Sequence, residues 1–506
     1  MSLPPLVAPA LAHGERTALL AGGRAVSFRE LLDRSARGAG RLLRGRADLS
    51  EERVAFLVPP DDSWVATLWS VLRAGGVAVP LGLSHPEDEL AYAVDDADAS
   101  LLVAHPSARD RLAPLARGRG LPLVLTTDLD AGPEAALPEV DPARRALLLY
   151  TSGTTSRPKG AVHTHASLAA QVSTLLAAWG ITGEDRTVNV LPLHHVHGIL
   201  NVVSCALAAG AACEMLPGFD AEAVWSRIEA GAFTLFMAVP TVYSKLLSHH
   251  EGQPPERRAR LSEAAARLRL VVSGSAALPE TLFRRWREVT GHDLLERYGM
   301  TEVGMALSNP LDGPRVPGSV GTPLPGVEAR LVDERGLDVA DGTPGELLLR
   351  GPGLFREYWK RPGATSQAFR DGWFVTGDVA VVEDGRYRIL GRKSVDILKC
   401  GGYKVSALEV EAALREHPLV RDVAVVGLPD AEWGERIAAA VVAKSPVTLD
   451  ALRDFARARL APYKLPTRLL LLDELPRNAM GKVTKADVGR RFEGTGTATT
   501  PESGTD

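Results

Sequence analysis

The sequence predicts an α/β protein with a large, multi-layered N-terminal domain of mixed and parallel sheets with helices, and a small α+β C-terminal domain. Over residues 53–104, short apolar runs of strand length alternate with helical stretches, a βαβ rhythm typical of layered α/β folds. The rhythm resumes over residues 146–272. Near the C-terminus, an amphipathic helical pattern at residues 407–416 precedes two strand-like runs. With 506 residues, the chain is long enough for two or more hydrophobic cores.

Taken in order, the elements follow from apolar runs, helical periodicity and turn residues. We expect strands over residues 53–58, 76–81, 100–104, 146–150, 187–191, 233–238, 268–272, 327–332, 346–350, 420–426 and 437–443, and a strand-rich segment over 378–390. We expect helices over residues 63–74, 87–96, 166–179 and 407–416. The last residues, 494–506, are rich in Gly, Thr and Ser and are predicted to be disordered.

Composition and charge argue against several classes of function. Apolar residues make up 45% and charged residues 24% of the chain, and the net charge is −4, so neither a nucleic-acid partner nor a polybasic membrane patch is predicted. The three cysteines, Cys205, Cys213 and Cys400, fit a reducing cytosol better than a disulfide framework. No apolar run reaches about 18 residues, and residues 1–12 lack a signal-peptide pattern. We expect a cytoplasmic protein without a membrane span, as a monomer or homodimer.

A loop rich in hydrogen-bond donors follows the apolar strand at residues 146–150. Residues 151–160 read Thr-Ser-Gly-Thr-Thr-Ser-Arg-Pro-Lys-Gly. Glycines let backbone N–H groups approach an anion, and the hydroxyl groups and Lys159 add donors and positive charge, so the loop suits a polyphosphate. The order of residues excludes the G-x-x-x-x-G-K-[ST] phosphate loop. The alternative is a polar surface turn.

The loop resembles the T-S-G-T-T-G-x-P-K-G phosphate loop of adenylate-forming enzymes, the family of acyl- and aryl-CoA synthetases, luciferases and peptide-synthetase adenylation domains. Further segments are similar to family motifs and stand in the family order: Pro192–Gly198 (P-L-x-H-x-x-G), Tyr298–Glu302 (Y-G-x-T-E) and Pro476–Lys482 (P-R-x-x-x-G-K). The resemblance covers nearly the whole chain. One departure is Ser156, where the family usually has glycine; a left-handed backbone conformation there would strain the loop.

The resemblance implies ATP and Mg²⁺ as ligands. Mg²⁺ prefers one or two carboxylates plus phosphate oxygens, so Glu302, with Thr154, would hold it. Lys482 would offset charge where the acid meets the phosphates. The catalytic residues implied are Lys482, Glu302, Thr301 and His195. The ATP-binding residues implied are Thr151, Ser152, Gly153, Thr154, Thr155, Lys159, Gly274, Ser275, Ala276, Ala277, Arg297, Tyr298, Gly299, Met300, Asp378 and Arg392.

Several of these residues also have a structural interpretation. Lys482 alone reads as a solvated loop lysine, and residues 273–278 read as a tight turn before a helix that starts at Pro279. The histidines at 194, 195 and 197 suggest a metal site, but their spacing matches no common one. A packed, hydrogen-bonded histidine is the usual alternative. The match to the family order favours an adenine slot at 273–278 and a site role for His195.

The resemblance also implies a joint between two domains and coenzyme A as co-substrate. Gly391-Arg392-Lys393 is similar to the family hinge, with Lys393 as its pivot. We therefore expect an N-terminal domain over residues 1–391, a C-terminal domain over 392–493 and a tail over 494–506. The next loop is similar to the one that swings to the thiol channel. The residues expected along the path of coenzyme A are Lys399, Gly401 and Gly402.

Arg297 indicates which acid is activated. Long-chain and aryl relatives usually have glycine at this position, and an uncompensated arginine beside the acyl pocket is costly. A second substrate carboxylate would resolve that cost, because arginine binds a carboxylate bidentately, and His197 and Ser275 would add donors. The segments Leu295–Glu302 and His194–Gly198 are similar to those of malonyl-CoA synthetases, which also take methylmalonate. We expect a ligase that joins malonate to coenzyme A through an acyl-adenylate.

Two other functions stay open at this stage. If Arg297 pairs with Glu296 or Asp293, or holds the His195 loop, the protein is a CoA ligase for a short monocarboxylic or aryl acid. A stand-alone adenylation module that loads a carrier protein is the other possibility. The sequence has no phosphopantetheine-serine signature of a carrier domain, and thioester release on free coenzyme A would distinguish the two.

Overall fold

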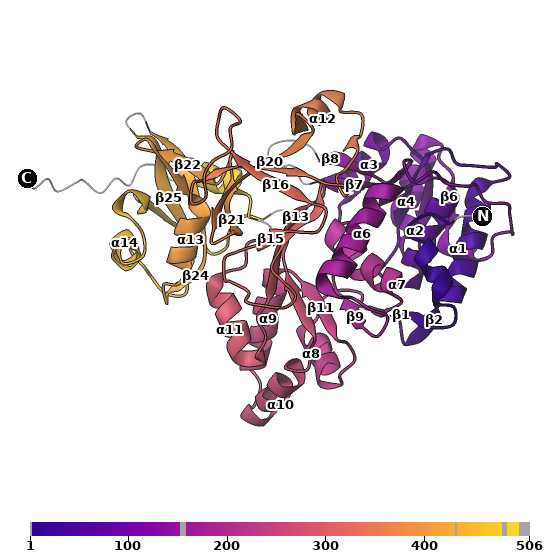
Figure 1. Ribbon diagram of the computed structural model, residues 1–506, viewed down its shortest axis with the longest axis horizontal. Helices are drawn as coiled ribbons and strands as arrows, with labels where there is room; N and C mark the ends of the chain where they lie inside the picture. The colour runs from indigo at the N-terminus through magenta and orange to yellow at the C-terminus, as the bar shows by residue number, and fades with distance from the viewer. Residues whose placement is uncertain (1–2, 152–157, 431–432, 478–482, 495–506) are drawn as a thin grey trace, which may run out of the picture. The chain divides into compact units, whose positions relative to one another are not determined.

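The computed structural model describes residues 3–151, 158–430, 433–477 and 483–494 (Figure 1). The chain forms two compact units. The large unit contains residues 1–329 and 349–375, and the small unit contains residues 330–348 and 376–506. The chain passes from one unit to the other within three strands, β16 (Glu328–Val332), β17 (Gly345–Arg350) and β20 (Trp373–Glu383).

The first sheet of the large unit is mainly parallel. Within the described residues it has seven strands in the order β18-β8-β7-β4-β3-β5-β6, of which β8 runs antiparallel to both of its neighbours, β7 and β18, while the other pairs are parallel. Its strands are β3 (Arg53–Leu57), β4 (Val77–Pro80), β5 (Ala99–Ala104), β6 (Leu123–Leu125), β7 (Arg145–Thr151), β8 (Lys159–Thr164) and β18 (Glu357–Tyr358). The apolar runs predicted as strands at 53–58, 76–81, 100–104 and 146–150 are confirmed.

The second sheet of the large unit is also mixed. As described, it has nine strands in the order β15-β14-β13-β12-β11-β9-β10-β1-β2, with parallel pairing from β1 through β13 and antiparallel edges. Its strands are β1 (Thr17–Ala21), β2 (Arg24–Ser27), β9 (Arg186–Asn189), β10 (Ala212–Met215), β11 (Leu235–Ala238), β12 (Leu270–Ser273), β13 (Leu295–Met300), β14 (Gly304–Ser308) and β15 (Thr322–Pro323). The predicted strands at 187–191, 233–238 and 268–272 are confirmed.

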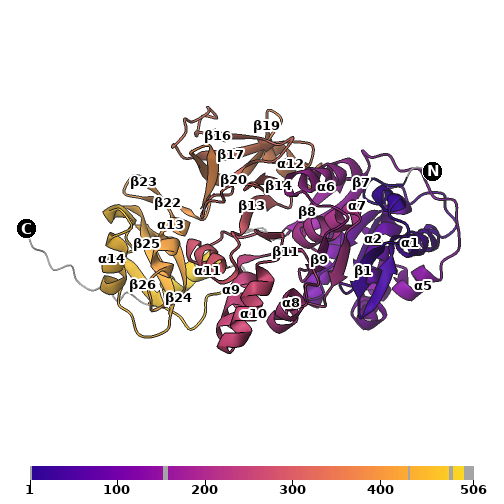
Figure 2. The ribbon, with the colours of Figure 1, turned by 60° about the horizontal axis from the view of Figure 1, so that its bottom comes forward.

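Helices cover both sheets and produce the layers. Side chains alternate across a strand: Val54 and Phe56 of β3 join the core that contains α2 and α6, whereas Ala55 and Leu57 face α3 and α4. Helices α8 to α11 pack on one another beside β11 (Figures 1 and 2). The helices are η1 (Ala8–Ala12), α1 (Phe28–Leu43), α2 (Asp62–Arg73), α3 (Glu87–Asp96), η2 (Pro106–Ala108), α4 (Arg109–Arg119), α5 (Thr126–Asp130), α6 (His165–Trp179), η3 (His197–Ser204), α7 (Cys205–Ala209), α8 (Ala221–Glu229), α9 (Pro240–Glu251), α10 (Pro255–Ala265), α11 (Glu280–Thr290) and α12 (Pro362–Ala368).

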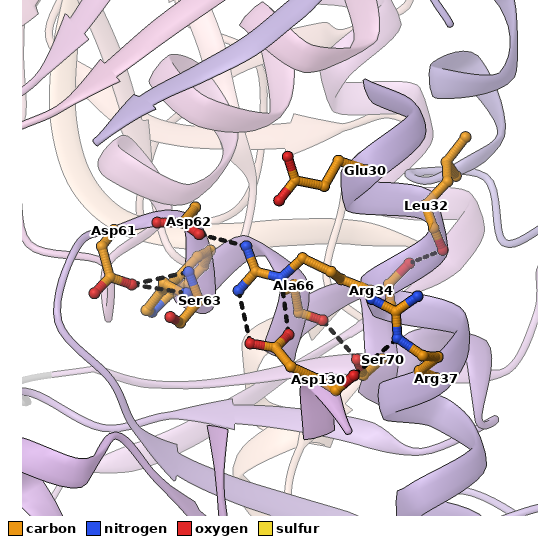
Figure 3. Close-up of polar contacts among 12 residues, drawn as sticks. Glu30, Leu32, Arg34, Arg37, Asp61, Asp62, Ser63, Ala66, Ser70 and Asp130 are labelled. Carbon is orange, nitrogen blue, oxygen red and sulfur yellow. Dashed lines mark hydrogen bonds and ion pairs between the residues drawn. The ribbon is translucent and has the colours of Figure 1, made fainter. Parts of the chain in front are cut away.

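A buried arginine ties three N-terminal helices together (Figure 3). Arg34 of α1 is 7% exposed. Its Nε donates to Oδ1 of Asp130 at 2.8 Å, and its Nη1 donates to Asp62 at the start of α2. Arg37, one turn further along α1, donates to the carbonyl oxygen of Asp130 at 2.8 Å. These charge-assisted bonds fix α1 against α2 and α5.

The small unit is an α+β domain. Its central hairpin, β24–β25, is extended through β25: β22, which carries β23, pairs with the start of β25, and the parallel β26 pairs with its later residues. The helix predicted at 407–416 and the strands predicted at 420–426 and 437–443 are confirmed. Its elements are β22 (Ile397–Cys400), β23 (Tyr403–Ser406), α13 (Ala407–Arg415), β24 (Val420–Asp430), β25 (Gly434–Ala443), α14 (Leu449–Arg457), η4 (Pro462–Lys464), β26 (Arg468–Leu471) and α15 (Lys485–Gly494).

A third sheet has the strand order β16-β17-β20-β19. Strand β21 (Arg386–Arg392) pairs with β20, and β19 spans Phe369–Arg370. It matches the strands predicted at 327–332 and 346–350 and the strand-rich segment at 378–390. The mixed α/β fold class is therefore confirmed. The domain boundary at residue 391 stays a prediction, and residues 495–506 of the predicted tail lie outside the described residues. No helix in the described parts is long and apolar enough to cross a membrane.

Replacing Arg34 by leucine should destabilise the large unit. The change leaves Asp62 and Asp130 without their partner, and because Asp130 is partly exposed we expect a loss of about 2 kcal/mol rather than the full cost of breaking a buried pair. The control is Arg24→Leu, which removes an arginine whose side chain is 57% exposed and which also pairs with Asp62; its effect should stay within about 0.5 kcal/mol. Thermal unfolding measures both, and equal shifts in Tm would contradict the role given to Arg34.

Candidate active site

The predicted site residues of the large unit gather where strands end. Thr151 ends β7, Ser273 ends β12 and Met300 ends β13, while His195 and His197 follow β9. In open α/β sheets, ligands bind at the carboxyl ends of parallel strands. The fold therefore places the phosphate-loop flanks, the 273–278 turn and the Tyr-Gly-Met-Thr-Glu segment in positions that suit one ligand.

The phosphate loop is described only at its two ends. Thr151 and Lys159 pair across β7 and β8, and the Thr151 hydroxyl donates to the Lys159 carbonyl oxygen at 3.4 Å. The Tyr92 hydroxyl donates to the carbonyl oxygen of Pro158 at 2.6 Å, which fixes the exit of the loop. The predicted residues Ser152, Gly153, Thr154 and Thr155, and the departure at Ser156, lie outside the described residues.

The Thr301-Glu302 turn is held from three sides. Nε2 of His163 lies 2.7 Å from the Thr301 carbonyl oxygen and must donate, because a carbonyl only accepts. Burial lowers the pKa of His163 to about 4, so this histidine is neutral at pH 7. The Phe355 N–H donates to the Glu302 carbonyl oxygen at 2.7 Å. The Tyr358 hydroxyl donates to Oε1 of Glu302, also at 2.7 Å.

Glu302 fits a role as a magnesium ligand. Among the described residues, its Oε1 accepts the hydroxyl of Tyr358, and Oε2 would be available to a cation. Within the described residues, no group of three His, Cys, Asp or Glu side chains is arranged to hold a metal alone. Mg²⁺ takes most of its ligands from phosphate and water and needs only one or two carboxylates, so a single carboxylate such as that of Glu302 fits this ion. Thr154, the second predicted ligand, lies outside the described residues.

Arg297 is a buried cation that forms no ion pair with a carboxylate among the described residues. It is 3% exposed, and its Nε and Nη2 have no hydrogen-bond partner among the described residues. Burial lowers its pKa to about 10, so it is still charged at pH 7. A Cβ atom on Gly274 would lie 2.5 Å from the guanidinium carbon, so only glycine lets the guanidinium group approach the 273–278 turn this closely.

His197 and Ser275 lie beside this cation. Nδ1 of His197 is 3.1 Å from the Ser275 hydroxyl, and its buried Nε2 has no partner in the described structure. Burial, reinforced by the nearby charge of Arg297, lowers the pKa of His197 well below its usual value, so the ring is neutral. Ser275 has a left-handed backbone, with φ of +70°, a strained conformation often found at functional sites. The structure thus brings together the three residues predicted to bind a substrate carboxylate.

The predicted histidine of the P-L-x-H-x-x-G segment belongs to a row of three histidine rings in tilted and edge-on contact. His195 lies 4.0 Å from His194 between ring centroids, and His194 lies 4.7 Å from His85. Burial, with the two neighbouring histidines as further causes, lowers the pKa of His194 to about 2. His194 is therefore neutral, and its ring lies between His195 and His85, which follows β4.

The 273–278 turn is anchored by a residue that the sequence did not single out. The Leu278 N–H donates to Oε1 of Glu296 at 3.0 Å, and burial raises the pKa of Glu296 to about 8. Pro279 caps α11, as predicted. The predicted ATP-binding residues near this turn lie at its exposed tip, Ala276 and Ala277, and at the half-buried end of β13, Tyr298, Gly299 and Met300.

The predicted site residues of the small unit form their own contacts. Arg392 pairs with Asp378 through Nε and Oδ1 at 3.0 Å and donates to the Thr376 carbonyl oxygen at 2.6 Å. Lys393, the predicted pivot, pairs with Glu346 at 2.9 Å. The predicted coenzyme A residues lie on the β22–β23 hairpin: Lys399, Gly401 and Gly402. Lys482 lies outside the described residues.

His163, Glu296 and Tyr358 are contact residues that sequence reasoning missed. His163 occupies one position of a six-residue strand, where a histidine is usually a packed side chain, and Glu296 entered the sequence analysis only as a possible partner of Arg297. Tyr358 belongs to a two-residue strand with no periodicity to detect. The only sequence signal for Glu296 was its place next to Arg297.

A large α/β unit in which His163 and Tyr358 connect the strand after the phosphate-loop segment to the Thr301-Glu302 turn, together with an α+β C-terminal unit, matches the fold of adenylate-forming enzymes. The chain belongs to the AMP-binding enzyme family: the family profile matches residues 7–359, and the profile of the AMP-binding enzyme C-terminal domain matches residues 409–482. It is thus an acid–thiol ligase of the acyl-CoA synthetase type, which uses ATP, Mg²⁺ and coenzyme A.

Known proteins that resemble the chain include malonate ligases. The mitochondrial malonate–CoA ligase of Mus musculus is 48% identical, over 99% of this chain and 92% of its own length. The crystal structure of ATP-bound MatB from Rhodopseudomonas palustris is 35% identical with a TM-score of 0.89, over 97% of this chain and 99% of that one. A malonyl-CoA ligase complex with methylmalonyl-CoA and AMP is 40% identical with a TM-score of 0.69, over 94% of this chain and 100% of that one.

The raised pKa of Glu296 should appear in the pH dependence of stability. Because its folded-state pKa, about 8, exceeds the ordinary value of 4.5, the folded protein retains a proton that the unfolded chain has released. The stability from this group is complete below pH 4.5 and is lost as the pH rises to about 8. Glu296→Gln stays neutral, so its Tm should fall less than that of the wild type between about pH 5 and 8.5.

The matched control for Glu296→Gln is Glu184→Gln, since the side chain of Glu184 is 90% exposed. The Tm of this control should follow the wild type across the same pH range. Parallel curves for Glu296→Gln and the wild type would show that Glu296 is ionised in the folded protein, contrary to the account of the 273–278 turn.

Proposed function

We propose that the protein is an ATP- and Mg²⁺-dependent ligase that converts malonate, and also methylmalonate, with coenzyme A to the acyl-CoA thioester, AMP and pyrophosphate through an acyl-adenylate. The observation that carries the choice of acid is the buried Arg297, whose Nε and Nη2 have no partner among the described residues. A dicarboxylate supplies one carboxylate for reaction and one for this cation. The relatives named malonate–CoA ligase support the same acid.

The energetics favour a substrate with two carboxylates. An isolated buried charge is costly, and arginine offers a planar fork that binds a carboxylate through two parallel hydrogen bonds. Removing one partner of a desolvated, hydrogen-bonded charge pair costs about 2–5 kcal/mol. Acetate, which lacks the second carboxylate, should therefore react with a kcat/KM about 30-fold to several thousandfold lower than malonate.

The residues of the site divide the adenylation step between them. Arg297, with His197 and Ser275, holds the remote carboxylate, so the reacting carboxylate can be oriented toward the α-phosphate. Lys159 and the rest of the phosphate loop bind the β- and γ-phosphates, and Glu302 with Thr154 would hold Mg²⁺, which when bound makes the α-phosphate a better electrophile. Lys482 offsets charge as the carboxylate meets the phosphate.

The second step uses the small unit. We propose that it turns about Lys393, so that Lys482 serves adenylation and the loop of Lys399, Gly401 and Gly402 serves the approach of coenzyme A. The thiolate of coenzyme A then attacks the acyl carbon, and AMP leaves. Asp378 and Arg392 would bind the ribose hydroxyls, because a carboxylate accepts hydrogen bonds from two neighbouring hydroxyls.

Other assignments of Arg297 have less support. A ligase for short monocarboxylic or aryl acids requires that Arg297 be structural. Glu296, however, accepts the N–H of Leu278, and Asp293 pairs with Arg287 at 3.3 Å. A module that loads a carrier protein would require an acceptor other than coenzyme A, whereas the related malonyl-CoA ligase structure contains methylmalonyl-CoA.

The proposal includes a reducing compartment, which we take to be the cytoplasm. Cys205, Cys213 and Cys400 are all buried and unpaired, as expected where disulfides do not form. The mammalian relatives are named as mitochondrial. Fractionation of cells that produce the chain with a C-terminal tag would distinguish the two locations.

The proposed acid can be tested by measuring pyrophosphate release with malonate, methylmalonate, succinate, acetate, butyrate and benzoate. Malonate should have the highest kcat/KM. Arg297→Leu should lower that of malonate by about 30-fold or more, because the second carboxylate loses its charged partner. In the same variant, kcat/KM for butyrate should stay unchanged or rise.

Arg315→Leu is the control for this substitution. Arg315 is also partly buried and donates to the Asp293 carbonyl oxygen, at 2.6 Å, just before β13. Its replacement should affect all acids alike. If Arg297→Leu lowers kcat/KM for all acids by the same factor, or if butyrate or benzoate is the best wild-type substrate, Arg297 does not bind a second carboxylate.

A further inference from the structure

Tyr358 lies between two oppositely charged groups, Lys159 and Glu302. Its hydroxyl donates to Oε1 of Glu302 at 2.7 Å. The ammonium nitrogen of Lys159 lies 5.1 Å from the centroid of its ring, a distance typical of a cation–π contact. One side chain thus contacts the cation at the end of the phosphate loop through its ring and the candidate metal ligand through its hydroxyl.

The backbone around Tyr358 fixes the ring at this position. Tyr358 pairs with Ala161 in β8, and the Trp359 N–H donates to the Gly160 carbonyl oxygen at 2.7 Å. Phe355 packs edge-on against the ring, with centroids 4.7 Å apart, and its own N–H holds the Glu302 carbonyl oxygen. The ring is therefore tied to the strand that starts at Lys159 and to the turn that contains Glu302.

Neither contact of Tyr358 neutralises the charge of Lys159 or of Glu302. An ammonium group and a carboxylate in the same site attract each other and, once paired, neutralise each other. In the described part of the chain, Lys159 and Glu302 form no ion pair with each other, whereas each contacts Tyr358. A phenol hydroxyl satisfies one carboxylate oxygen and a ring face attracts an ammonium group, yet neither contact cancels the charge that it binds.

We propose that Tyr358 is a positioning residue that separates the phosphate-binding cation from the metal-binding carboxylate and orients each of them toward Mg·ATP. This inference rests on the proposed function, in which Lys159 binds phosphate and Glu302 binds Mg²⁺. Without the hydroxyl, Glu302 can turn toward Lys159, and the site then binds the metal–nucleotide complex less well. Without the ring, Lys159 also loses the surface that holds it.

Equilibrium binding of ATP, without any carboxylic acid so that no reaction occurs, tests the inference. Titration calorimetry gives the Kd of ATP with and without Mg²⁺, and the ratio of the two measures the contribution of the metal. Tyr358→Phe keeps the ring and loses only the donor to a charged group, so the ratio should fall by about tenfold, while metal-free binding changes by less than about twofold. Tyr358→Leu should also weaken metal-free binding by about two- to fivefold.

Two further variants make the result specific. Tyr387→Phe removes the hydroxyl of a tyrosine in β21 and should leave both Kd values unchanged. In a Glu302→Gln background, Tyr358→Phe should have little further effect on the Mg²⁺ ratio, because the hydroxyl acts through Glu302. An unchanged ratio in Tyr358→Phe, or an equal loss with and without Glu302, would overturn the inference.

The outcome can be separated from that of the proposed function. The titrations contain no malonate, so a wrong choice of acid leaves them interpretable. A wild-type protein that binds no ATP contradicts the ligase itself. A wild-type protein that binds Mg·ATP, with a Tyr358→Phe variant that binds it equally well, contradicts only the role of Tyr358.

Discussion

The charge of Arg297 is the constraint on which the acyl side of this site depends. A guanidinium group that is almost fully buried has lost its hydration, and the described residues supply no carboxylate to replace it. The surroundings are built to accept the group in spite of this cost. Gly274 leaves room for it, and the neutral His197 adds no second positive charge. A buried cation of this kind favours an anion as its ligand.

The nucleotide side follows a different principle, in which contacts hold charged groups without neutralising them. His163, Phe355 and Tyr358 each hold one atom of the Thr301-Glu302 turn, and Tyr358 also contacts Lys159. These contacts come from β8 and from the segment next to β18, which pair with each other. The position of Glu302, the candidate metal ligand, is thus fixed by contacts from β8, which begins at Lys159, and from the segment of β18. The backbone pairing of β8 with β18 therefore connects Lys159 and Glu302.

The sequence predicted those parts of the molecule whose pattern is local. Apolar runs predicted β3, β4, β5 and β7 of the first sheet and β9, β11 and β12 of the second, but not the parallel strands β1, β6, β10 and β13. The family motifs predicted site roles for Arg297, His197, Ser275 and Glu302, and these roles stay predictions. Contacts that depend on tertiary pairing were not predictable. The role of Tyr358 follows from the pairing of β18 with β8, about 200 residues away in sequence, and the raised pKa of Glu296 follows from burial, which no local pattern reports.

The most direct test of the central claim compares malonate with monomethyl malonate as substrates of the wild-type protein. The two acids share the carboxylate that reacts, and they differ in whether the remote group carries a charge. If Arg297 binds that charge, kcat/KM for malonate should exceed that for the monoester by about 30-fold or more. Equal values, or a preference for the monoester, would show that Arg297 does not bind the remote carboxylate of the substrate, and would contradict the account.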